Sequence, residues 1–140
     1  ILTANGRSVL RFNSNEYIKL AEPLKLPDYV ITFHDFPDLQ PIQPFVGWSS
    51  SDPTKSLGWY DAYHGVKHNR EGEFERGTLR CVFEAVSACI ALLVAQFGPT
   101  ALNVELSGLV GLTTPNWPIG DMYVSGLTST ERTPVNHPDL

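Results

Sequence analysis

The stretch that decides the fold is Thr-Leu-Arg-Cys-Val-Phe-Glu-Ala-Val-Ser-Ala-Cys-Ile-Ala-Leu-Leu-Val-Ala-Gln-Phe-Gly-Pro, residues 78–99. Its apolar residues recur every three or four positions, which is the period of one face of an α-helix. Glu73 and Glu75 precede the stretch, where they would favour the helix dipole, and Gly98-Pro99 ends it. We therefore expect one long buried helix over residues 73–97. Its predicted core stripe comprises Leu79, Val82, Phe83, Val86, Cys89, Ile90, Leu93 and Phe97.

The composition of the whole chain is typical of one folded domain. The 140 residues are 42% hydrophobic and 18% charged, and a chain of this length can bury about 68% of its unfolded surface. The net charge is −5. General nucleic-acid binders usually carry an excess of basic residues, because neutralising phosphates supplies most of their affinity. The charge therefore argues against a general nucleic-acid binder.

Hydropathy and cysteine usage predict a cytoplasmic protein with no membrane partner. The most apolar run, residues 85–95, is 11 residues long, whereas a helix needs about 20 to cross a bilayer. Residues 1–10 lack the basic start and apolar stretch of a secretion signal. Cys81 and Cys89 would be about 12 Å apart on one helix, too far for a disulfide, and such unpaired thiols suit a reducing compartment.

The segments on either side of the long helix are rich in proline and glycine. Upstream, residues 1–50 predict β structure and loops, with a hairpin of residues 8–12 and 16–20 and a strand at 29–33. Downstream, residues 100–140 predict short β segments at 102–106 and 122–125, followed by a tail.

A second, shorter helix is expected over residues 53–68, capped by Ser51 or Asp52 with Pro53 at its first position. We therefore predict a single α+β domain over residues 1–140. Its helical hairpin, residues 53–97, would be covered by short β segments from both flanks.

Polar and aromatic residues concentrate between the two predicted helices. Residues 59–70 read Trp-Tyr-Asp-Ala-Tyr-His-Gly-Val-Lys-His-Asn-Arg. Six of them form the candidate site, which we call the 63–70 cluster: Tyr63, His64, Lys67, His68, Asn69 and Arg70.

The residues of this cluster allow three interpretations. His64 and His68 share one helical face, and with Asp61 one turn earlier they could offer three ligands to a metal ion. Alternatively, a histidine could move protons on a phosphodiester that Lys67 and Arg70 hold. In the third interpretation the segment is a polar turn between two helices, with Trp59 and Tyr63 packing the hairpin from within.

The run from Tyr63 to Arg70, followed by Phe74 and the helix at residues 78–97, resembles a group of uncharacterised bacterial proteins with a Tyr-x-x-x-Lys-His-x-Arg signature. That group is similar to the HEPN superfamily (higher eukaryote and prokaryote nucleotide-binding helical domains). The resemblance covers about residues 57–97. It implies a helical bundle, a homodimer, an RNA or nucleotide ligand and no cofactor.

Ribonucleases of the HEPN superfamily carry an arginine, then four to six intervening residues, then their catalytic histidine. The resemblance places that histidine at His68 and the polar second position at His64, but the arginine position holds Tyr63, and Arg70 lies on the other side of His68. It therefore implies a degenerate, non-catalytic HEPN-like module. The alternative is a metal-independent endoribonuclease using His68 with Lys67 and Arg70.

HEPN domains contain four or five helices, and this chain predicts two. Because the chain begins at Ile1 rather than Met, two explanations stay open: further helices lie upstream, or strands cover the helical pair.

Overall fold

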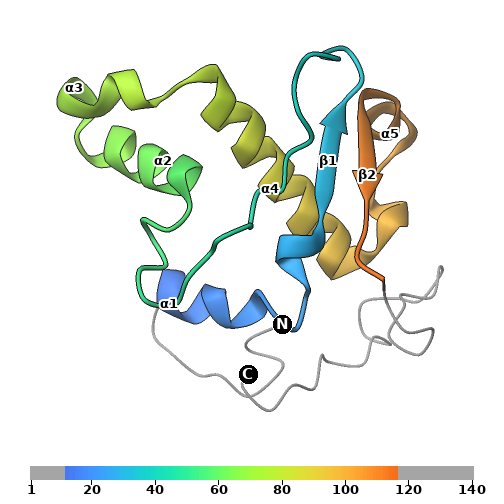
Figure 1. The fold of residues 1–140 in the computed structure, drawn as a ribbon, viewed down its shortest axis with the longest axis horizontal. Helices are drawn as coiled ribbons and strands as arrows, with labels where there is room; N and C mark the ends of the chain where they lie inside the picture. Colours follow the sequence, from blue (N-terminus) through green and yellow to red (C-terminus); the bar gives the residue numbers. More distant parts are fainter. Residues whose placement is uncertain (1–11, 117–140) are drawn as a thin grey trace.

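Helix α4, Leu79–Phe97, is the element on which the rest of the fold is arranged (Figure 1). A computed structural model describes residues 12–116 of the chain. Their elements are, in order, α1 (Ser14–Tyr17), η2 (Ile18–Leu20), η3 (Leu26–Asp28), β1 (Val30–Phe33), α2 (Gly58–His68), α3 (Arg70–Glu73), η4 (Phe74–Arg76), α4, η5 (Pro99–Ala101), α5 (Val104–Leu109) and β2 (Val110–Thr113).

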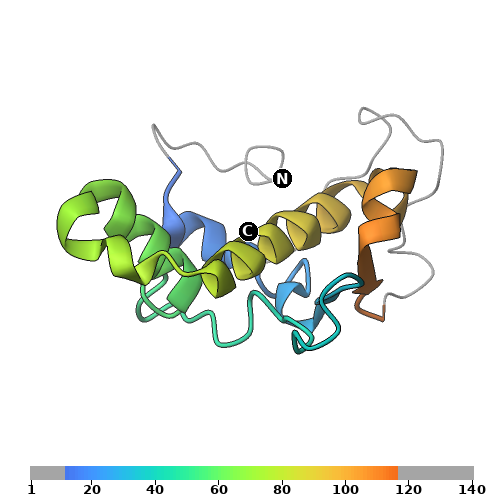
Figure 2. The ribbon, with the colours of Figure 1, turned by 90° about the horizontal axis from the view of Figure 1, so that it is seen from above.

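The two ends of α4 carry different parts of the fold. Helices α2 and α3 lie beside its N-terminal end, whereas α5 and the strands lie toward its C-terminal end (Figures 1 and 2). The 63–70 cluster is therefore at the end of the molecule away from the sheet.

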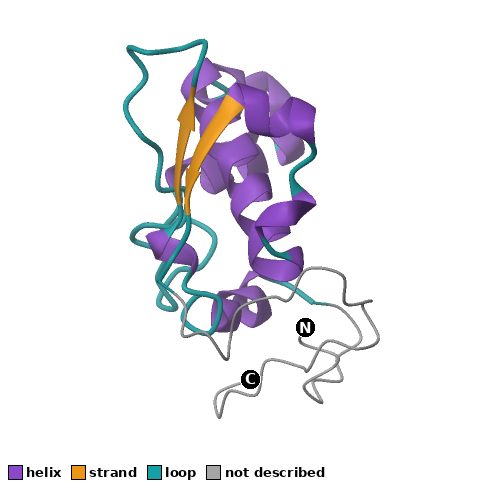
Figure 3. Ribbon diagram, turned by 90° about the vertical axis from the view of Figure 1, so that its right-hand side faces the viewer, coloured by secondary structure: helices purple, strands orange, loops and turns teal. Residues whose placement is uncertain are grey.

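The two strands come from opposite flanks of the helical part and form one antiparallel pair (Figure 3). Val30 lies opposite Thr113, and Phe33 lies opposite Val110. On the other side of β1, Ile31 forms a bridge with Ile42. The α+β class and the predicted strand at 29–33 are confirmed, and β1 packs against α4.

The predicted helix over residues 73–97 is wrong at its start. Gly77 has φ −76° and ψ 63°, which is not helical, and the Thr78 hydroxyl accepts a hydrogen bond from the Cys81 amide at 3.3 Å. A glycine followed by a good N-cap residue favours a new helix start. Glu73 and Glu75 consequently belong to α3 and η4, not to the first turn of the long helix.

The second helix also starts later than predicted, at Gly58 rather than residue 53. The Asp52 carbonyl accepts from the Ser56 amide at 2.9 Å, and its carboxylate accepts from the Lys55 amide at 3.2 Å. These bonds close a single turn, after which Leu57 is extended and buried.

Two predicted β segments are helical instead. Residues 16–20 fall in α1 and η2, where the Asn13 side chain accepts from the Asn15 amide at 3.0 Å. Residues 102–106 lead into α5, where the Asn103 side chain accepts from the Leu106 amide at 2.8 Å. Asparagine side chains that bond nearby amides favour such helix starts. The predicted segment 122–125, and all of the predicted strand at 8–12 except Phe12, lie outside the described residues.

The buried face of α4 is not the predicted stripe. Of that stripe only Ile90 is buried, whereas Leu79, Val82 and Val86 are 69%, 55% and 43% exposed. The face that packs on the core is formed mainly by small residues: Ser87, Ala88, Ala91, Val94 and Ala95. Small side chains let the backbone approach closely, and the volume of the core comes from large residues elsewhere: Leu24, Leu26, Tyr29, Ile31, Phe45 and Leu57.

Candidate functional site

The 63–70 cluster occupies the last turns of α2 and the start of α3. Tyr63, His64, Lys67 and His68 lie on α2, Asn69 joins the two helices, and Arg70 begins α3. All six side chains belong to exposed residues. The structure thus brings the predicted residues together on an outward-facing turn.

The two histidines lie next to each other on α2. Their ring centroids are 4.4 Å apart and the ring planes are tilted by 46°, as the predicted four-residue spacing requires. Within residues 12–116, neither imidazole has a hydrogen-bond partner that would fix its orientation. Both residues are exposed, and within the described part of the chain no hydrogen bond orients either ring for catalysis.

Tyr63 and Trp59 behave differently, although both were predicted to pack the hairpin from within. Trp59 is half-buried against the core, and its indole nitrogen donates to the Pro44 carbonyl at 2.8 Å. Tyr63 is 53% exposed, with the Lys67 ammonium 5.7 Å from its ring centroid. The prediction is confirmed for Trp59 and wrong for Tyr63.

Asn69 has a structural role in this arrangement. Its side-chain oxygen accepts a hydrogen bond from the Gly72 amide at 3.3 Å, which caps α3. This bond lets the chain turn directly from α2 into α3.

Asp61, the third residue of the metal hypothesis, is engaged by an arginine. Arg76 in η4 donates to the Asp61 carboxylate and, at 2.7 Å, to Glu73. These two carboxylates raise the pKa of Arg76 above its usual value, and Glu73 has the larger effect. In the described part of the chain no group of three or more His, Cys, Asp or Glu side chains could hold a metal ion. The three-ligand interpretation therefore finds no support in the geometry.

Sequence reasoning missed Arg76 because one of its two partners, Asp61, is 15 residues away. The absence of a side chain at Gly65 makes room for it: a Cβ there would lie 3.0 Å from both the Arg76 guanidinium and the Glu73 carboxylate. The spacing of Glu73 and Arg76 was a local signal for half of this network.

A second feature missed from the sequence is an apolar surface on α4. We define the open face of α4 as Leu79, Val82, Val86, Cys89 and Leu93, of which Leu93 is half-buried and the others exposed. The most apolar 18-residue window of this helix has a mean hydropathy of 1.7, yet only 33% of that window is buried. By length and composition alone such a helix could cross a membrane, a test that core helices of water-soluble proteins also pass.

Comparison with known proteins gives no further assignment: no family model, curated protein or solved structure matches the chain. The resemblance to the HEPN superfamily therefore stays a prediction from the residues that carry it.

Proposed function

We propose that this chain is a non-catalytic, HEPN-like interaction module that binds a second copy of itself through the open face of α4. The observation that supports this proposal is the exposure of that face. An amphipathic helix ordinarily turns its larger apolar residues toward the core, but α4 turns its small residues inward and leaves Leu79, Val82 and Val86 outside.

The spacing along the open face suits a helix partner. Its residues follow one another at intervals of three, four, three and four positions, which is the a/d pattern of two helices that pack along a seam. None of them is charged. In a two-fold dimer the same surface meets itself, so one self-complementary apolar seam is sufficient.

A second copy fits this surface better than a bilayer does. The opposite side of α4 packs on the core, where Ser87 and Ala91 are both 0% exposed. Crossing a membrane would remove that side from the core. A helix partner would cover the open face and leave the core intact.

Sedimentation velocity at micromolar concentrations tests the proposal. We expect a species of twice the 15.5 kDa chain mass. Val86→Glu should shift it to monomer, because a carboxylate in an apolar seam loses its hydration without gaining a partner. The matched control is Val104→Glu on α5, where Val104 is 89% exposed and lies outside the open face. A wild-type monomer, or a dimer that Val86→Glu leaves unchanged, would contradict the proposal.

The adjacent histidines favour a second candidate, a metal-independent endoribonuclease using His68. The two exposed imidazoles lie 4.4 Å apart. Lys67 and Arg70 beside them could hold a phosphate while an imidazole moves a proton. Against this, Tyr63 stands where such enzymes carry arginine, so a cation that stabilises the scissile phosphate is missing there.

Cleavage of a labelled single-stranded RNA in the presence of EDTA separates the two candidates. For a non-catalytic module, the wild-type rate should equal that of His68→Ala. His34→Gln serves as the control for losing a histidine outside the cluster. Cleavage that disappears in His68→Ala but persists in His34→Gln would replace the first proposal with the nuclease.

A further inference from the structure

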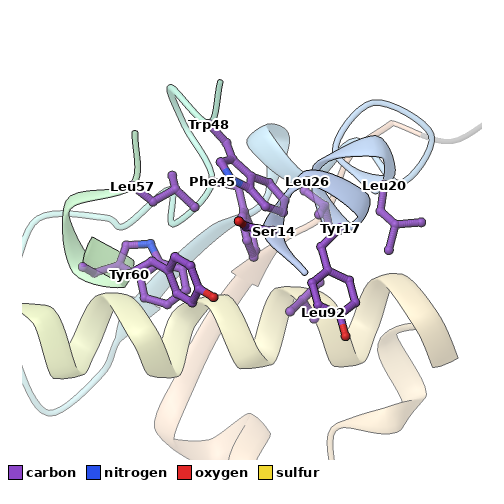
Figure 4. A pocket seen from close by; sticks show the side chains of 10 residues that line it. Ser14, Tyr17, Leu20, Leu26, Phe45, Trp48, Leu57, Tyr60 and Leu92 are labelled. Atoms are coloured by element: carbon purple, nitrogen blue, oxygen red, sulfur yellow. The ribbon is translucent and has the colours of Figure 1, made fainter. Parts of the chain in front are cut away.

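An apolar cavity of about 260 Å³ lies between α1, α2 and α4. Its lining includes Tyr17, Leu26, Phe45, Trp48, Tyr60 and Leu92. Figure 4 shows Tyr17 and Tyr60 on two sides of this space, with Leu92 of α4 below Phe45 and Trp48. Among residues 12–116, no charged side chain contributes to the lining.

Hydrogen bonds hold the aromatic wall of the cavity in place. The Trp48 indole nitrogen donates to the Pro53 carbonyl at 2.9 Å, and that of Trp59 donates to the Pro44 carbonyl at 2.8 Å. The Phe45 ring lies 5.3 Å from Trp48 and 6.2 Å from Trp59, centroid to centroid. Because both indole N–H groups already have partners, these side chains offer the cavity only apolar surface.

The two tyrosines supply the polar groups of the lining that stay available. Within the described residues, neither the Tyr17 nor the Tyr60 hydroxyl has a hydrogen-bond partner. The Ser14 hydroxyl, by contrast, is 3.0 Å from the Thr54 hydroxyl. A phenol at the edge of an apolar space can orient one polar group of a bound molecule.

We propose that this cavity binds a small, uncharged, planar aromatic molecule that carries one hydrogen-bonding group. Drug-sized ligands occupy pockets of about 300–1,000 Å³, so the observed volume suits one or two fused rings. Aromatic pairs favour offset and edge-to-face contacts, which Phe45, Trp48 and Tyr60 can provide. A charged ligand would lose its hydration without meeting an opposite charge.

Titration with 1-naphthol, followed through the indole N–H signals of Trp48 and Trp59 in ¹⁵N-labelled protein, tests this proposal. We expect saturable shifts of both signals. Naphthalene-1-sulfonate, which has the same rings and a fixed charge, should bind about tenfold or more weakly. Tyr60→Phe should weaken binding of 1-naphthol several-fold but leave binding of naphthalene unchanged, since only the former uses the hydroxyl.

A cavity-filling variant locates the site. Leu92→Trp should weaken binding of 1-naphthol by about tenfold or more, because the indole takes the space of the ligand. Leu106→Trp on α5 is the matched control, because Leu106 is 38% exposed and Leu92 is 40% exposed. Leu106 does not line the cavity, so this change should have no effect on binding. Unchanged melting curves would show that both variants fold.

Four results would overturn the proposal. These are the absence of saturable shifts at the solubility limit of 1-naphthol, equal binding of the sulfonate, unchanged binding by Leu92→Trp, and nuclear Overhauser contacts in the free protein between Phe45 and residues 1–11 or 117–140. The last result would mean that the chain itself fills the cavity.

Discussion

The guanidinium of Arg76 donates a hydrogen bond to the carboxylate of Asp61, 15 residues earlier in the chain. It also donates to Glu73, three residues earlier. One cation therefore ties the connection between α2 and α4 back onto α2. This contact accompanies the break between η4 and α4, where the sequence predicts a continuous helix.

Replacing Arg76 with glutamine should loosen that connection. We expect faster amide hydrogen exchange in residues 70–77, while exchange within α4 stays unchanged. Because the ion pairs are exposed, salt should screen them, so the difference between variant and wild type should shrink at high ionic strength.

Arg80→Gln is the matched control for this prediction, because Arg80 pairs with Glu84 inside α4 at 2.9 Å. It should leave exchange in residues 70–77 unchanged. Equal exchange in wild type and Arg76→Gln at low salt would show that the network does not hold the segment.

Replacing Ser87 with alanine should make the protein more stable. Its hydroxyl is buried, and within residues 12–116 it is a buried side-chain oxygen without a hydrogen-bond partner. Ser87→Ala removes an unpaired hydroxyl and introduces the residue with the highest helix propensity. It should therefore raise the free energy of unfolding by about 0.5–1 kcal/mol. Urea denaturation measures the change.

The reverse substitution provides the control. Ala91 is one turn later on the same buried face and is 0% exposed. Ala91→Ser should lower stability by about 1–3 kcal/mol, because it buries a hydroxyl among apolar side chains. If Ser87→Ala were destabilising by more than 1 kcal/mol, about the value of a typical hydrogen bond, the Ser87 hydroxyl would have to be satisfied.

The orientation of α4 can be tested with two substitutions of equal chemistry. Ile90→Ala removes a residue that is 5% exposed and should cost about 2–5 kcal/mol through the cavity it leaves. Leu79→Ala removes one that is 69% exposed and should change stability by less than about 0.5 kcal/mol. Melts must be recorded where sedimentation shows monomer, so that assembly does not contribute.

Equal losses of about 2–5 kcal/mol in both variants would support the stripe predicted from periodicity, because that stripe includes both Ile90 and Leu79. The opposite ranking would contradict the observed orientation of α4.

The sequence was sufficient to locate the long helix but not to orient it. Both faces of α4 are apolar, so a three-to-four spacing exists for the large residues and for the small ones alike. Periodicity weighted toward large residues selects Leu79, Val82 and Val86. The structure instead places Ala88 and Ala91 in one buried cluster with Tyr29 and other large side chains from distant segments, which a local pattern does not reveal.

Caps account for most of the misplaced boundaries. Asn13, Thr78 and Asn103 each accept a hydrogen bond from an amide two or three residues later. Asn13 and Asn103 start helices where β segments were predicted, and Thr78 starts α4 inside the longer helix that was predicted. The strand at 29–33 was found because β-branched and aromatic residues coincide there with burial. The 63–70 cluster was assembled correctly because its members are neighbours in sequence, whereas the Arg76–Asp61 contact depends on the fold.

The paired histidines should bind zinc weakly. Two exposed imidazoles supply two ligands, whereas a structural zinc site uses four, and Asp61 is engaged by Arg76. Protein purified without an affinity tag or chelator should contain less than about a tenth of an equivalent of transition metal by elemental analysis.

Added zinc should bind less as the pH falls, because protons compete with the metal ion for imidazole nitrogens. If His68→Ala loses this zinc binding and His34→Gln keeps it, the binding belongs to the His64–His68 pair. Stoichiometric metal in the purified protein would contradict the prediction.

Cys89 reports on the proposed assembly without any substitution. Both cysteines are free, and Cys89 is exposed in the middle of the open face of α4, whereas Cys81 is half-buried. A second copy seated on that face would cover the Cys89 thiol. Its alkylation rate, followed by mass spectrometry of the peptide, should therefore fall as protein concentration rises through the dimer range. In Val86→Glu the rate should stay at its dilute value at every concentration, because that variant is expected to be monomeric, and Val104→Glu should behave like wild type. A Cys89 rate that is independent of concentration in a protein that sedimentation shows to be dimeric would place the interface elsewhere than on the open face.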